Sequence, residues 1–200
     1  MEYKNIKVKV IYFVHGSTTD NLEHKASGWN DVKLSEKGIQ QSLDLREKID
    51  FDEIDVVITS DLERAKQSAN NVFAGQKIII VDDRLRECNY GDLNGKDSDL
   101  VKYEEHIYMP FPNGESLMDV KARMEDFCEY LFDKFDGKTV AIVAHRAPQL
   151  ILEHLTKKIT IEEAIDNDWR KTKDWKPGWK YELRTRRKIR ETLDKVKHLD

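Results

Sequence analysis

The first apolar residues of the chain alternate with polar ones, as they do in a strand with one buried face. Ile6, Val8, Val10 and Tyr12 follow this pattern, and the segment then continues as an apolar run to Val14. A strand that is apolar on both faces is typical of a sheet covered on both sides. The pattern therefore predicts an N-terminal strand that enters the core of the protein.

Short apolar runs and longer segments of helical periodicity alternate along the rest of the chain. Further strands are predicted at DVVITS (55–60), KIIIV (77–81) and KTVAIVAH (138–145), with an edge strand at PGWKYEL (177–183). Helices are predicted at 34–49, 61–73, 114–135 and 147–155. Helical spacing relates Ile39, Leu43 and Leu45 in the first helix. In the third helix an inward stripe is predicted from Leu117, Val120, Met124, Phe127 and Leu131.

This alternation predicts an α/β fold, a three-layer sandwich in which a mostly parallel sheet is flanked by helices. Residues 84–113 contain Gly, Asn, Asp and Pro with little periodicity, which indicates a long excursion rich in loops. We expect one domain over residues 1–184, followed by a charged C-terminal tail or terminal helix over residues 185–200.

Composition narrows the classes of ligand. The formal net charge is -4, so we expect neither nucleic acid nor a membrane surface as a partner, and a small ligand is favoured. No stretch approaches 18 consecutive apolar residues. Cys88 and Cys128 lack CxxC spacing, which suits two inert thiols in a reducing cytosol better than a metal or redox site. We therefore predict a cytoplasmic protein, whose oligomeric state the sequence does not reveal.

Four residues with chemically useful side chains follow predicted strands. His15 and His145 end two of them, Arg64 lies in the helix after the second strand, and Glu87 follows the third. Taken singly, a histidine at a strand end is more often a hydrogen-bonded packing residue, and an arginine such as Arg64 is more often a surface charge of its helix. Because the carboxyl ends of parallel strands meet at one edge, we expect the four to converge there. A neutral imidazole can attack phosphorus, a guanidinium can bind phosphate oxygens, and a carboxylic acid can protonate a leaving alcohol. The set therefore suits phosphoryl transfer.

Several ordered motifs carry a family resemblance. VHGSTTDN resembles the Arg-His-Gly phosphate-binding motif of the histidine phosphatase superfamily, the phosphoglycerate mutase-like proteins. The resemblance continues in GWNDVKLSEKG, TSDLERAKQSA, LRECNYGDLNG, PNGES and AIVAH, and covers roughly residues 7 to 155. A combination of motifs in this order is specific where one motif alone would not be.

The resemblance implies roles for the four residues. His15 would be the nucleophile that becomes phosphohistidine, His145 the second imidazole, and Arg64 the group that holds the phosphoryl oxygens. Glu87 would protonate the leaving oxygen and then activate water. The substrate-binding positions that match the family's loop are Gly16, Thr18 and Asn21. The resemblance implies no metal and no cofactor, apart from 2,3-bisphosphoglycerate if the protein is a mutase.

The chain departs from the family pattern at two positions. Val14 stands where the family has an arginine before the nucleophilic histidine. Arg146 directly follows the second histidine, where many relatives have small residues. We hypothesise that Arg146 supplies the guanidinium that Val14 does not; the alternative is a surface residue at a helix start.

The function favoured by the sequence is a metal-independent phosphatase that acts on a small phosphorylated substrate, a phosphate monoester. A phosphoglycerate mutase uses the same pocket, and a phosphate-binding protein that has lost turnover is a third alternative. Trp169, Trp175 and Trp179 lie in the C-terminal segment. We expect them to pack that segment over the site or core, with direct stacking on a substrate as the alternative.

Overall fold

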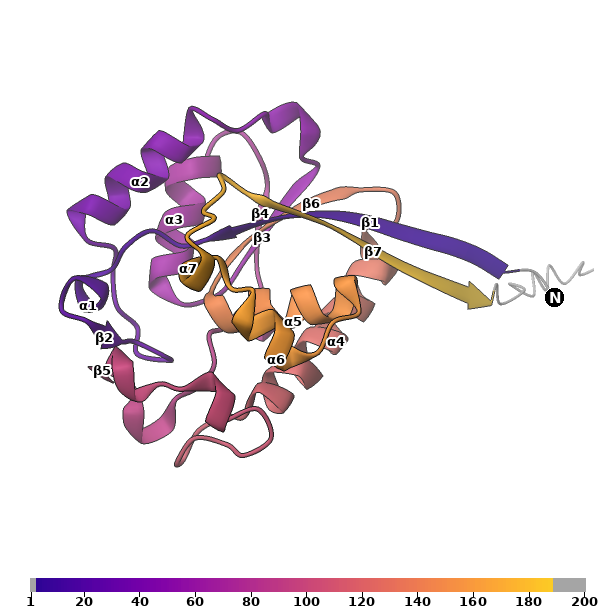
Figure 1. Ribbon diagram of the computed structural model, residues 1–200. Helices are drawn as coiled ribbons and strands as arrows, with labels where there is room; N and C mark the ends of the chain where they lie inside the picture. The colour runs from indigo at the N-terminus through magenta and orange to yellow at the C-terminus, as the bar shows by residue number, and fades with distance from the viewer. Residues whose placement is uncertain (1–2, 189–200) are drawn as a thin grey trace, which may run out of the picture.

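A five-stranded sheet forms the centre of the protein in the computed structural model, which describes residues 3–188 (Figure 1). Its strand order is β4-β3-β6-β1-β7. Neighbouring strands are parallel except for β7, which pairs antiparallel with β1. The strands are β1 (Tyr3–Val14), β3 (Val56–Thr59), β4 (Ile79–Val81), β6 (Thr139–Ala144) and β7 (Trp179–Lys188).

Alternation along β1 sends side chains to two different apolar clusters. Val10 and Tyr12 belong to the cluster that contains residues of α4 (Leu117–Lys134), α5 (Arg146–Lys157) and α6 (Ile161–Asp166). Ile11 and Phe13 belong to a second cluster, which contains residues of α3 (Glu63–Phe73). The helix α2 (Glu36–Arg46) lies beside α3 on that second face (Figure 1). The predicted three-layer α/β sandwich is therefore confirmed.

The predicted inward stripe of α4 is confirmed, because all five of its residues are buried. The apolar residues of α2 behave differently. Ile39 and Leu43 are each 42% exposed, and the helix buries Gly38 and Ser42 instead. The periodicity thus identified this helix correctly, but the buried face is the small-residue face. It is this face that lies against the loop after β1.

The excursion between β4 and α4 consists of short turns of 3-10 helix and one two-residue strand. The turns are η2 (Asp83–Leu85), η3 (Gly91–Leu93), η4 (Ser98–Leu100) and η5 (Tyr103–Glu105); a further one, η1 (Phe51–Glu53), precedes β3. The strand β5 (Lys96–Asp97) pairs with β2 (Lys25–Ala26) near the short helix α1 (Thr19–Leu22). The loop-rich character predicted for residues 84–113 is confirmed.

The C-terminal segment contains the short helix α7 (Trp169–Thr172) and then β7. β7 continues to Lys188, so residues 185–188 are strand and not the tail or terminal helix expected from residue 185 onward. The remainder of that predicted tail, residues 189–200, lies outside the described residues. Within residues 3–188 no helix combines the length and apolar character needed to cross a membrane.

Two glycines allow α2 to approach the loop after β1. A Cβ atom on Gly38 would lie 2.0 Å from the carbonyl oxygen of Ser17, and one on Gly16 would lie 2.4 Å from the carbonyl oxygen of Gly38. Hydrogen bonds accompany this contact: the backbone N–H and the hydroxyl of Ser35 both donate to the Ser17 carbonyl, each at 2.9 Å. The position of the loop therefore depends on the absence of side chains at residues 16 and 38.

We predict that Gly38→Ala lowers the free energy of unfolding by about 1–3 kcal/mol, because the added methyl group forces α2 away from the loop. Urea denaturation measures this change. Lys37→Ala, at an exposed position of the same helix, is the control and should change stability by less than about 0.5 kcal/mol. Equal stability of the two variants would contradict the close packing described above.

Candidate active site

The four residues predicted to converge do lie together at the carboxyl edge of the sheet. His15 follows β1, Arg64 lies in the first turn of α3, Glu87 follows β4, and His145 follows β6. The rings of the two histidines have centroids 5.1 Å apart. His15, Arg64 and Glu87 line a cavity of about 770 Å³, and His145 is completely buried beside His15.

The hydrogen bonds of His15 define its tautomer. Its Nδ1 lies 2.7 Å from the carbonyl oxygen of Gly16, which can only accept, so Nδ1 carries the proton. Its Nε2 accepts a hydrogen bond from Nε of Arg64 at 3.3 Å. Burial, and then the charge of Arg64, lowers the pKa of His15 to about 3. At neutral pH the imidazole is uncharged, and its Nε2 lone pair is the nucleophilic one.

Arg64 is held in place by backbone carbonyls. Its Nη1 donates to the carbonyl of Asn30 at 3.0 Å and its Nη2 to that of Gly28 at 2.7 Å. The residue is only 2% exposed. This leaves Nε directed at His15, so a fixed positive charge lies beside the nucleophilic nitrogen.

His145 has a fixed backbone and a side chain without polar partners. Its carbonyl accepts a hydrogen bond from the hydroxyl of Tyr12 at 2.7 Å. Neither ring nitrogen has a hydrogen-bond partner among residues 3–188. Burial, with the charge of Arg64 next, lowers the pKa of His145 well below its usual value. Because a buried polar atom without a partner costs about 1–3 kcal/mol, this arrangement indicates a group that binds a ligand.

Glu87 connects the excursion to the first turn of α5. Its Oε1 accepts hydrogen bonds from the backbone N–H groups of Ala147 and Cys88, both at 2.9 Å, and from the hydroxyl of Tyr103 at 3.2 Å. Its Oε2 accepts from the backbone N–H of Arg146 at 3.1 Å. A carboxylate at the N-terminus of a helix is also stabilised by the helix dipole. The candidate acid therefore has a defined position next to the strand end that carries His145.

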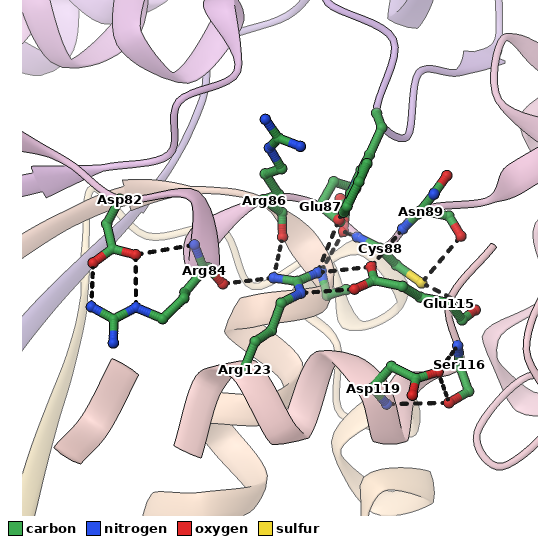
Figure 2. Close-up of polar contacts among 12 residues, drawn as sticks. Asp82, Arg84, Arg86, Glu87, Cys88, Asn89, Glu115, Ser116, Asp119 and Arg123 are labelled. Carbon is green, nitrogen blue, oxygen red and sulfur yellow. Dashed lines mark hydrogen bonds and ion pairs between the residues drawn. The ribbon is translucent and has the colours of Figure 1, made fainter. Parts of the chain in front are cut away.

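Arg123 and Glu115 hold the segment that carries Glu87 (Figure 2). Arg123, from α4, donates to the carbonyls of Arg84, Arg86 and Glu87 at 2.6, 2.7 and 3.0 Å. It also forms an ion pair with Glu115 at 3.0 Å. Sequence reasoning missed both as positioning residues. Glu115 lies within the PNGES motif, which was a usable signal, whereas nothing in the helical periodicity distinguished Arg123.

The three predicted loop residues have different roles. Gly16 lines the cavity, and its backbone N–H donates to the hydroxyl of Ser68 at 3.0 Å. Asn21 also lines the cavity. Thr18 is fully buried and does not line it. Instead, Thr18 and Asn21 form the capping box that begins α1. Thr18 is thus placed to position Asn21 rather than to touch a ligand.

Arg146 lines the cavity, but its side chain already has partners. Its Nε pairs with Oδ2 of Asp168 at 2.5 Å, and its guanidinium lies over the ring of Tyr103 at 4.7 Å. Its Nη groups have no protein acceptor within residues 3–188. Asp168 also pairs with Nη1 of Arg170 at 3.2 Å, and Arg170 lines the same cavity. Neither Asp168 nor Arg170 was singled out from the sequence.

Two of the three C-terminal tryptophans lie at the cavity, and the third packs against one of them. Trp169 and Trp175 line it, and Trp169 stacks on Trp179 with ring centroids 5.3 Å apart. This confirms the expectation that the segment packs over the site. In the described part of the chain, no group of three or more His, Cys, Asp or Glu residues is placed to hold a metal ion.

Comparison with known proteins identifies the family of the chain. Residues 11–174 match the model of the histidine phosphatase superfamily (branch 1). A 2,3-bisphosphoglycerate-dependent phosphoglycerate mutase of Bartonella tribocorum is 32% identical over 173 residues, covering 76% of this chain and 84% of that protein. An uncharacterized phosphatase, PhoE, of Bacillus subtilis is 32% identical over 137 residues, covering 66% of this chain and 69% of that protein.

A solved structure has the same fold. The structure of a mycobacterial glucosyl-3-phosphoglycerate phosphatase in complex with VO3 superimposes with a TM-score of 0.69 at 25% identity, covering 80% of this chain and 85% of that one. The fold and the site define a protein of the phosphoglycerate mutase-like class. The chain belongs to the histidine phosphatase superfamily.

The low pKa of His15 predicts a pH dependence of stability. The pKa of His15 is about 3 in the folded protein and 6.5 ordinarily. The contribution of the neutral imidazole to the free energy of unfolding is therefore fully present above pH 6.5, and it is lost as the pH falls toward 3. Between pH 6.5 and 4.5, we expect the free energy of unfolding to decrease by about 1 kcal/mol per pH unit from this residue. His15→Gln should show a shallower dependence in urea denaturation. Parallel curves for the two proteins would contradict the assignment.

Replacement of Arg123 tests whether this side chain holds the segment that carries Glu87. Arg123→Met leaves three carbonyls and Glu115 without their partner, and should lower the free energy of unfolding by about 2–4 kcal/mol. Hydrogen exchange of residues 84–89 should increase as well. Lys121→Met, which removes a surface pair with Glu125, is the control. Unchanged exchange in the Arg123 variant would show that other contacts hold the segment.

Proposed function

We propose that the protein is a metal-independent phosphatase that hydrolyses a small phosphate monoester through a phosphohistidine intermediate on His15. The observation that carries the proposal is the environment of Nε2 of His15. That atom carries the lone pair of a neutral imidazole and accepts a hydrogen bond from the fixed guanidinium of Arg64 at 3.3 Å. Beside it lies the buried imidazole of His145, whose nitrogens have no hydrogen-bond partner within residues 3–188.

The first chemical step joins Nε2 of His15 to phosphorus and breaks the bond from phosphorus to the ester oxygen. Glu87, protonated, gives its proton to that leaving oxygen. Arg64 is placed to bind the phosphoryl oxygens during transfer, because its Nε already points at the attacking nitrogen. The buried imidazole of His145 offers a further polar contact to the same group, which would give a partner to the ring nitrogens that have none within residues 3–188.

The second step releases phosphate. Glu87, now ionised, takes a proton from a water molecule whose oxygen attacks phosphorus, and the bond from phosphorus to Nε2 breaks. The imidazole leaves neutral and ready for another turn, consistent with the low pKa of His15. The positive charge that offsets the phosphoryl group comes from side chains of the chain itself, which is why the proposal includes independence from metal.

The lengths of the alignments favour a phosphatase over a mutase. The alignment with the mutase spans 173 positions but includes only 76% of the 200 residues of this chain, about 152. The alignment with the phosphatase PhoE spans 137 positions and includes 66% of the chain, about 132 residues. The mutase alignment therefore contains about 21 positions that this chain lacks, against about 5 for the phosphatase. A mutase needs additional enclosure to keep water from its phosphohistidine.

Hydrolysis of p-nitrophenyl phosphate in EDTA tests the proposal. We predict turnover by the wild type, loss of more than about 1,000-fold in His15→Ala, and a loss of about 100- to 10,000-fold in kcat for Glu87→Gln. The exposed His24 supplies a matched control, since His24→Asn should retain full activity. Addition of 2,3-bisphosphoglycerate with a phosphoglycerate identifies a mutase if isomerisation then exceeds hydrolysis.

Two results would count against the proposal. Activity that survives His15→Ala rules out the nucleophile, and a folded wild type without any hydrolysis or isomerisation indicates a phosphate-binding protein. Arg146 as the replacement for the missing arginine stays a prediction, tested by the activity and phosphate affinity of Arg146→Ala.

A further inference from the structure

Val14 stands where the family pattern has an arginine, so one guanidinium is missing from a specific side of the cavity. Side chains two residues apart on a strand share a face, so Val14 lies on the same face of β1 as Tyr12. Val14 lines the cavity, and Tyr12 belongs to the cluster on the α4 and α5 side of the sheet. Any cation that replaces the missing arginine must therefore approach from that side.

We propose that Arg170, from α7, is the second guanidinium that binds the phosphoryl group and replaces the arginine absent at Val14. This inference rests on the proposed function, because it assigns a residue to the same phosphoryl site. It differs from the prediction for Arg146, which lies at the start of α5.

The C-terminal segment places Arg170 close to the end of β1. Trp179 pairs with Tyr12 in the sheet register, and Trp169 stacks on Trp179. This stacking brings α7 beside the carboxyl end of β1, as Figure 1 shows. Arg170 follows Trp169 directly and lines the cavity together with His15 and Val14. The segment that covers the site thus brings a guanidinium to the side from which one is missing.

The guanidinium of Arg170 is held in place but still has N–H donors without a protein acceptor within residues 3–188. It lies over the ring of Trp169 at 4.3 Å, and both its Nη1 and its backbone N–H bond to Oδ1 of Asp168, at 3.2 and 3.0 Å. The carboxylate of Asp168 is only 1% exposed. An arginine has five N–H donors, and one of those of Arg170 has a protein acceptor within residues 3–188. The others are available to phosphate oxygens.

Asp168 holds two guanidinium groups on one carboxylate. Its Oδ2 pairs with Arg146 and its Oδ1 with Arg170, so the trio has an excess of one positive charge. This excess charge lies at the wall of a cavity that already contains Arg64. The arrangement suits an anionic ligand, which would complete the neutralisation.

The two arginines act on different neighbours. After burial and Arg64, the charge of Arg170 is among the causes that lower the pKa of His15, and it also lowers that of His145. The charge of Arg146 acts on Tyr103, where it opposes the rise in pKa that burial produces. In the structure the guanidinium of Arg146 lies over the ring of Tyr103 at 4.7 Å, whereas Arg170 lines the cavity together with His15.

Kinetics in EDTA with p-nitrophenyl phosphate, together with inhibition by orthovanadate, test the assignment. We expect Arg170→Ala to lower kcat/KM by about 10- to 100-fold and to weaken vanadate inhibition by a similar factor, since a hydrogen bond to a charged group is lost. Lys171→Ala is the matched control on the same helix, because Lys171 pairs outward with Glu104 and Asp166. It should behave as the wild type.

A rescue variant separates binding from structure. Val14→Arg, introduced into Arg170→Ala, should recover most of the lost kcat/KM and vanadate affinity, because it returns a guanidinium to the same side of the cavity. Circular dichroism and thermal melting of each variant establish that it is folded. Recovery by Val14→Arg supports the assignment, and a folded double variant that stays as weak as Arg170→Ala contradicts it.

The failure of this inference is distinct from the failure of the proposed function. Hydrolysis that depends on His15 but is unchanged in Arg170→Ala overturns only the role of Arg170, and a loss confined to Arg146→Ala transfers that role to Arg146. If the wild type shows no hydrolysis that depends on His15, the proposed function fails. In that case calorimetric titration with inorganic phosphate decides the inference: weaker binding by Arg170→Ala supports it, and equal binding overturns it.

Discussion

The carboxylate of Glu87 is the interaction on which the site depends most. It accepts hydrogen bonds from the first two N–H groups of α5, and so joins the excursion after β4 to the helix that follows His145. Without it, the N-terminus of α5 would lose acceptors at the point where one histidine is buried. The same oxygens are the ones proposed to transfer a proton. A structural cap and a chemical group are thus combined in one side chain, and Arg123 with Glu115 supports it from behind.

Burial of the two imidazoles and one guanidinium explains the electrostatics of the site. The carbonyls of Gly28 and Asn30 accept hydrogen bonds from Arg64 and hold its guanidinium in place. Burial first, and then the charge of Arg64, lowers the pKa of both His15 and His145. A neutral imidazole next to a fixed cation is prepared to accept a phosphoryl group, whose negative charge the cation then meets. The second imidazole, that of His145, is buried, and its nitrogens have no partner within residues 3–188.

Much of this arrangement was predictable from the sequence, because it follows from periodicity and topology. Apolar runs identified the parallel strands, and the ends of those strands identified His15, Glu87 and His145, with Arg64 in the adjoining helix turn. Local signals were less reliable where small residues make the contact. The buried face of α2 consists of Gly38 and Ser42, which no hydrophobic pattern reveals, whereas its apolar Ile39 and Leu43 are exposed.

The rest of the site depends on contacts between distant parts of the chain. Arg170 lines the cavity and pairs with Asp168 in the segment where Trp169 stacks on Trp179, a residue of the edge strand next to β1. Neither Asp168 nor Arg170 belongs to a motif, and their spacing resembles that of any charged surface helix. The cytoplasmic location and the absence of nucleic-acid partners stay predictions, since fold alone does not define them.

Direct detection of the phosphorylated intermediate tests the central claim of this account. The protein would be mixed with p-nitrophenyl phosphate in EDTA, quenched at alkaline pH to preserve phosphohistidine, digested, and analysed by mass spectrometry. We predict one added phosphoryl group on the peptide that contains His15, in larger amount in Glu87→Gln, where the leaving group of this substrate needs little acid assistance but water is not activated. A phosphoryl group on any other residue, or its complete absence during measured turnover, would contradict the account.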